Sequence, residues 1–205
     1  MRNLLVLIAC IGLGATSALA GPLHDASRTG DVRSAIRLLD QGIDLSKPDS
    51  AGEPPLLLAA LAGHVDLVSL FLDRGADVEA RNKGGLTSLH AAAYGGRLDV
   101  VKLLVARGAS VDDARNFYQM TPLHAAAEEG HSDVITFLVA SKANVEAKER
   151  NGITPLTQAG WRQHWAAADS LLRAGAVCQE EALVGPWLFG ECTRRKSAAP
   201  VTAKQ

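Results

Sequence analysis

The chain has 205 residues, of which 47% are apolar and 21% charged, and its formal net charge is −1. An apolar fraction of this size supports a packed core and excludes a chain that is disordered throughout. The near-neutral balance argues against a nucleic-acid-binding protein, which would carry a basic excess. Three cysteines exclude a disulfide-dense miniature scaffold.

Residues 1–20 are expected to be a secretory signal peptide that is cleaved after Ala20. A short positive start precedes an apolar run, and the closing Ala-Leu-Ala triplet is a small-x-small cleavage pattern. Two alternatives stay open here: an uncleaved membrane anchor, for which the run is short, and lipoprotein processing at Cys10. We therefore expect a periplasmic or secreted protein that has no membrane contact after cleavage.

The mature chain would keep two cysteines, Cys178 and Cys192. An even pair in an oxidising compartment predicts a disulfide. The spacing of 14 residues fits neither C-x-x-C redox chemistry nor a zinc site. Two free thiols are the alternative.

The rest of the chain repeats itself with a period of 33 or 34 residues. Segments that start at 87, 121 and 154 read TSLHAAA, TPLHAAA and TPLTQAG, and earlier copies start at 21 and 54. In each copy, apolar residues at helical spacing predict a short helix from the start of the copy and a second helix, which follows a glycine in four of the five copies. One copy cannot bury its own apolar face, so the period predicts stacked units.

These segments resemble the ankyrin repeat family, whose signature is T-P-L-H-x-A at a period of 33. The resemblance covers 21–176 as five repeats. It implies an all-α solenoid of five stacked helix–turn–helix units with hairpin-like finger loops. It also implies that His24, His90 and His124 brace their helices and the neighbouring repeat through hydrogen bonds. Lys142 and Gln163 depart from the pattern, because each stands where other repeats have glycine.

The end of the chain departs from the repeat after residue 176. A short apolar cluster within 177–193 is expected to form a C-terminal cap on the last repeat, closed by the Cys178–Cys192 bond. The polar segment 194–205 is expected to be a mobile tail.

The mature chain contains none of the G-x-S-x-G, H-E-x-x-H, Walker A or G-x-G-x-x-G patterns. We therefore expect no enzymatic activity, no cofactor and no metal site. Glu128 and Glu129 are adjacent acids, but neighbouring helix residues point in different directions, so they do not form a catalytic dyad.

The family resemblance implies a concave contact face made by the fingers and the inner helices. The candidates are Lys83, Leu86, Tyr94, Phe117, Tyr118, Met120, Glu128, Glu129, Arg150, Trp161 and Arg162. Aromatic and arginine side chains are the usual anchors of interfaces, although Tyr118 or Trp161 could instead pack on a neighbouring repeat. We expect a monomer that binds a protein partner, acting as a chaperone, inhibitor or neutraliser of an exported enzyme. A secreted effector and an enzyme with an unrecognised site are the alternatives.

Overall fold

The computed structural model of the chain describes residues 21–198. The predicted signal peptide at 1–20 and the last residues of the predicted tail, 199–205, lie outside the described residues. The described part divides into two compact units, residues 21–110 with 115–117 and residues 111–114 with 118–198. Each unit is built from pairs of short helices.

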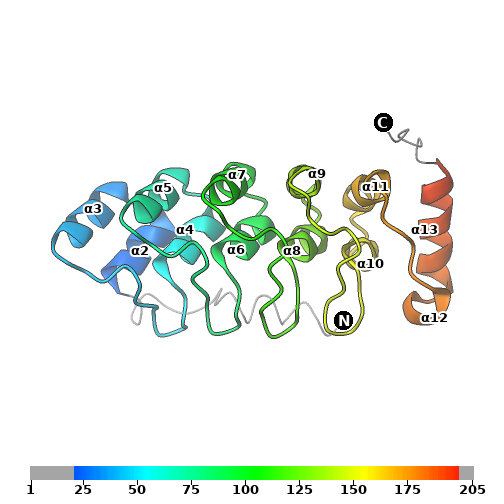
Figure 1. Cartoon of the computed structure of the whole chain (residues 1–205), viewed down its shortest axis with the longest axis horizontal. Helices are drawn as coiled ribbons and strands as arrows, with labels where there is room; N and C mark the ends of the chain where they lie inside the picture. Colours follow the sequence, from blue (N-terminus) through cyan, green and yellow to red (C-terminus); the bar gives the residue numbers. More distant parts are fainter. Residues whose placement is uncertain (1–20, 199–205) are drawn as a thin grey trace. The chain divides into compact units, whose positions relative to one another are not determined.

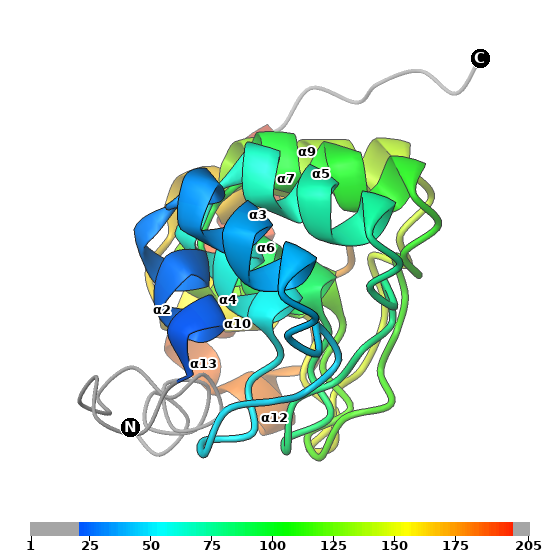
Figure 2. The same cartoon turned by 90° about the vertical axis from the view of Figure 1, so that its left-hand side faces the viewer.

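The first unit contains three helix pairs, each with an inner helix followed by an outer one. They are α2 (Pro22–Thr29) with α3 (Val32–Asp40), α4 (Pro55–Ala62) with α5 (Val65–Asp73), and α6 (Ser88–Tyr94) with α7 (Leu98–Ala106). The inner helices α2, α4 and α6 pack side by side, and the outer helices α3, α5 and α7 form a second row (Figures 1 and 2). The loops between pairs project as fingers.

The second unit contains two further pairs and a C-terminal extension. The pairs are α8 (Pro122–Glu129) with α9 (Ser132–Ala140) and α10 (Pro155–Trp161) with α11 (Trp165–Arg173); the extension is α12 (Glu181–Val184) and α13 (Pro186–Ala198). Helix α13 packs against α10 and α11 (Figure 1). It continues to Ala198, past the boundary at 193 that we expected between a cap and a mobile tail from 194.

The five helix pairs predicted from the repeat period are therefore all present, and the fold is all-α. Within residues 21–198, the only β-structure is an isolated bridge between Arg81 and Thr87. No helix in this part of the chain is long and apolar enough to cross a membrane.

The core combines alanines of the inner helices with large apolar residues from both the inner and the outer helices. Ala59, Ala60 and Ala92 are fully buried, which lets neighbouring inner helices approach closely. Leu67 and Phe71 of α5 are also fully buried. Burying a side chain of this size contributes about 1.5–3 kcal/mol.

The threonine at the start of a repeat caps the inner helix together with the histidine three residues later. In the fourth repeat, Oγ1 of Thr121 lies 2.9 Å from Nδ1 of His124, and Nε2 of that ring lies 3.0 Å from the carbonyl oxygen of Ile153. His124 thus joins the start of its own helix to the next finger, as predicted. Nδ1 of His90 likewise lies 2.9 Å from Oγ1 of Thr87, but Nε2 of His90 lies 3.4 Å from the side-chain amide nitrogen of Asn116.

Two residues that replace glycine adopt the left-handed conformation that the glycine would have had. Lys142 has φ of 72° and Gln163 has φ of 60°. The matching Gly108 and Gly130 have φ of 92° and 80°. The backbone of the repeat is therefore kept at these positions despite the less suitable side chains.

Candidate protein-binding surface

In three of the fingers, one polar side chain fixes the loop by accepting hydrogen bonds from backbone amides of the same loop. Oδ1 of Asp49 accepts from the amides of residues 51 and 53, at 2.9 and 3.0 Å. Oδ1 of Asn82 and Oε1 of Glu149 accept equivalent pairs of bonds in their fingers. The fingertips that follow are residues 50–52, 83–85, 117–119 and 150–152, and each ends on a left-handed residue.

The first unit presents three of the predicted contact residues, which we call the first-unit patch: Lys83, Tyr94 and Phe117. Lys83 is exposed, and its ammonium donates to the carbonyl of Ser50 on the preceding finger at 3.0 Å. Phe117 is 59% exposed, while its backbone amide donates to the carbonyl of Gly84 at 3.1 Å. Tyr94, at the end of α6, is half-buried. The backbone of Phe117 is therefore fixed by a hydrogen bond, while its side chain is exposed.

The second unit presents five more, which we call the second-unit patch: Tyr118, Glu129, Arg150, Trp161 and Arg162. Arg150 is exposed, and its amide donates to the carbonyl of Tyr118 at 2.8 Å. Trp161, the last residue of α10, is 44% exposed. Tyr118, Glu129 and Arg162 are half-buried. The exposed Trp161 ring and the cationic Arg150 are the two side chains of this patch with the most accessible surface.

Three of the predicted contact residues are buried, so the expectation that they lie on an accessible face is corrected. Leu86 is 3% exposed and Met120 is 7% exposed, because each immediately precedes the first residue of a repeat and points inward, as Ile153 does. Glu128 is 2% exposed, and its carboxylate is ion-paired with Arg162. These three side chains stabilise the fold and are not accessible to a partner.

The accessible charges at the fingertips are cationic. Lys83 and Arg150 are the only charged residues in the four tip segments, and both are exposed. The nearby carboxylates are buried: Asp49 is ion-paired with Arg28 at 2.5 Å, and Glu149 is 7% exposed. The tips therefore favour a partner whose surface carries acidic groups.

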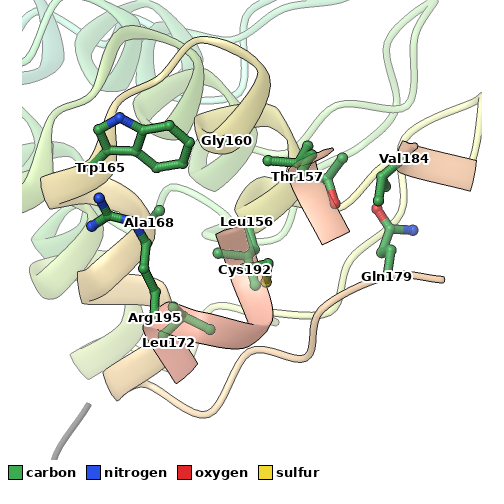
Figure 3. Close-up of a pocket in the computed structure, with 11 residues that line it drawn as sticks. Leu156, Thr157, Gly160, Trp165, Ala168, Leu172, Gln179, Val184, Cys192 and Arg195 are labelled. Carbon is green, nitrogen blue, oxygen red and sulfur yellow. The ribbon is translucent and has the colours of Figure 1, made fainter. Parts of the chain in front are cut away.

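A small apolar pocket lies where α13 covers α10 and α11 (Figure 3). The Arg195 guanidinium lies 4.5 Å from the centre of the Trp165 ring and pairs with Asp169 at 3.1 Å. The disulfide Cys178–Cys192 is formed and ties the segment after α11 to α13. The polar side chains of the pocket are thus engaged in holding the C-terminal helices.

Residues 21–198 contain no cluster of metal-ligating side chains. Among residues 21–198, no three His, Cys, Asp or Glu side chains are grouped so that they could hold a metal ion. His24, His90 and His124 each contact a neighbouring finger.

Comparison with known families agrees with this geometry. A family model described as ankyrin repeats in three copies matches residues 23–115 and 111–181. The chain belongs to the ankyrin repeat family. Ankyrin repeats are typically non-enzymatic modules for protein–protein interaction. The comparison with curated proteins gives no match.

Proposed function

We propose that this ankyrin repeat protein is exported and binds a protein partner through its fingertips and the ends of its inner helices. The supporting observation is the exposure of Phe117 and Trp161, which are 59% and 44% exposed in a family of binding modules. Large exposed aromatic rings bury much apolar area when a partner docks, and an aromatic side chain has few rotatable bonds to immobilise.

The export part of the proposal rests on the sequence of residues 1–20 and on the cysteine pair. The disulfide is compatible with an oxidising compartment such as a periplasm. The role that fits these features is a chaperone, inhibitor or neutraliser of another exported protein. Its partner would present an acidic surface to Lys83 and Arg150.

The experiment is a capture comparison from the compartment in which the mature chain is found. Immobilised mature chain is compared with Phe117→Ala and Trp161→Ala, one variant for each unit. The matched controls are Val65→Ala and Lys102→Ala on the outer helices, where Val65 is 38% exposed and the Lys102 side chain 50% exposed. We expect the mature chain to capture one partner protein. Phe117→Ala and Trp161→Ala should no longer capture it, whereas both control variants should.

The opposite pattern would reject the proposed surface. If the outer-helix variants abolish capture and the aromatic variants retain it, the binding face lies on the other side of the helix pairs. Far-UV circular dichroism of each variant establishes that the helices are intact.

A further inference from the structure

The first repeat contains a buried histidine with an unused ring nitrogen. His24 is 6% exposed, and its Nε2 lies 3.0 Å from the carbonyl oxygen of Lys47. A carbonyl oxygen only accepts hydrogen bonds, so Nε2 carries the proton and Nδ1 presents a lone pair. No described group donates a hydrogen bond to that Nδ1 atom. A buried acceptor without a donor destabilises the folded chain, because the group has lost its hydrogen bonds to water.

Other repeats show which group normally donates to this nitrogen. In the fourth repeat, Nδ1 of His124 lies 3.2 Å from the backbone nitrogen and 2.9 Å from the hydroxyl of Thr121. Thr87 and His90 have the same arrangement, at 3.3 and 2.9 Å. The first repeat has Gly21 at the threonine position, so the hydroxyl donor is missing.

The backbone of Gly21 faces the unused nitrogen. A β-carbon placed on Gly21 would lie 3.3 Å from Nδ1 of His24. Gly21 is also the N-cap residue of the eight-residue helix α2, and no side chain caps that helix. The equivalent backbone nitrogen in the fourth repeat, that of Thr121, is a donor to Nδ1, so the nitrogen of Gly21 is the candidate donor in the first repeat.

We propose that cleavage between Ala20 and Gly21 creates this donor, and that the α-ammonium group of Gly21 donates a hydrogen bond to Nδ1 of His24. In the cleavage, a signal peptidase adds water across the peptide bond. The hydroxyl goes to the carbonyl carbon of Ala20, and the nitrogen of Gly21 takes the hydrogen and a further proton from solvent. This inference rests on the predicted cleavage site, and it is independent of the proposed partner.

The new terminus is a better donor than the peptide bond that it replaces. The amide of an uncleaved chain has one N–H whose direction is fixed by the peptide plane. An ammonium group has three N–H bonds that rotate about N–Cα, and its charge strengthens the hydrogen bond to a neutral acceptor. Burial lowers the pKa of His24, which keeps the ring neutral and able to accept.

The charged groups around His24 have opposing effects on an ammonium group at Gly21. The carboxylates of Asp25 and Asp49 and the guanidinium of Arg28 all act on the ring. The two carboxylates stabilise an ammonium group, whereas Arg28 and the positive end of the α2 dipole oppose it. A direct test must therefore separate the hydrogen bond from the general effect of a charge at the terminus.

A four-member cycle makes that separation. The mature chain is prepared with the α-amino group of Gly21 either free or acetylated. Each form is made with the native His24 and with the substitution His24→Leu. Leucine occupies the equivalent position in the second repeat as the fully buried Leu57, so we expect the variant to fold. Because both backgrounds share the effect of terminal charge on the helix, that effect cancels in the cycle.

We expect acetylation to raise the unfolding equilibrium constant about tenfold more in the His24 background than in the His24→Leu background. Equal effects in the two backgrounds would overturn the proposal. In nitrogen NMR spectra, the Nδ1 resonance of His24 should shift on acetylation. Mass spectrometry of the exported protein should give Gly21 as the first residue, and a different first residue would also overturn the proposal.

Discussion

The buried carboxylate of Glu128, on α8, accepts a hydrogen bond from the guanidinium of Arg162, which follows α10 one repeat later. The Glu128 side chain is 2% exposed and that of Arg162 is 24% exposed. Burial raises the pKa of Glu128, and the bond to Arg162 opposes that rise. This pair joins the inner helices of adjacent repeats, so it contributes to stability as well as to the edge of the second-unit patch.

Replacing Arg162 with methionine should destabilise the protein by about 3 kcal/mol at neutral pH, because a buried carboxylate is left without its partner. The double variant with Glu128→Gln should recover most of that loss. Urea unfolding of the parent and of the two variants measures both effects. An Arg162→Met chain as stable as the parent would show that the pair contributes nothing.

Glu53 gives a prediction about pH. Burial raises the pKa of Glu53 to about 7, although the amide of Asn82 donates to both carboxylate oxygens, at 3.2 and 3.3 Å. The folded chain therefore holds this proton more tightly than the unfolded chain, whose reference pKa is 4.5. The contribution of Glu53 to stability is present below pH 4.5 and declines as the pH rises towards 7.

Glu53→Gln should remove this decline and make the protein more stable than the parent at pH 8, by roughly 3 kcal/mol from the size of the pKa shift. Unfolding midpoints measured from pH 4 to 8 test it. Glu181→Gln on the exposed helix α12 is the control, with a profile parallel to that of the parent. A Glu53→Gln profile that also runs parallel to the parent would contradict the prediction.

The left-handed Lys142 is a weak point of the fourth repeat. Lys142→Gly should stabilise the protein by about 1 kcal/mol, because glycine adopts φ of 72° without steric cost. Gly108→Lys is the matched reverse substitution: its φ is 92°, and a β-carbon there would meet no atom within 4 Å. The midpoint of thermal unfolding should rise for Lys142→Gly and fall for Gly108→Lys. Shifts of the same sign in both variants would contradict the prediction that the left-handed Lys142 is strained.

The repeat period predicted most of the fold, because each repeat carries the same local signals. The Thr87 and Thr121 caps, the bracing His124 and the left-handed Lys142 all follow from their positions within the 33-residue unit. The disulfide followed from the predicted export and the even number of remaining cysteines. Each of these features depends on local sequence or on a fixed spacing.

The direction of individual side chains was harder to predict. Leu86 and Met120 lie beside the fingertips in sequence but point into the core, since the backbone turns inward before each new helix. Glu128 was predicted to lie on the contact face, but its carboxylate is buried against Arg162, which is 34 residues away in the sequence. Pairing charged residues one period apart would have found this contact.

The disulfide should hold the C-terminal helices on the last repeat. The double variant Cys178→Ser with Cys192→Ser should lose about 3 kcal/mol of stability, as expected for closing a loop of this length. Hydrogen exchange should increase first in α13. Leu188→Ala, which keeps the bond but removes the buried contact over Gly160, is the comparison. Unchanged exchange in α13 after loss of both cysteines would show that packing alone holds the helix.

The most direct test of the central claim, that exposed side chains of the fingers and inner helices bind a partner, is the affinity of the captured protein for single variants. Isothermal titration compares the mature chain with Phe117→Ala, Trp161→Ala and Lys102→Ala. The account predicts that the Kd rises about tenfold or more for the two aromatic variants and is unchanged for Lys102→Ala. Unchanged affinity in both aromatic variants, with a loss for Lys102→Ala, would contradict it.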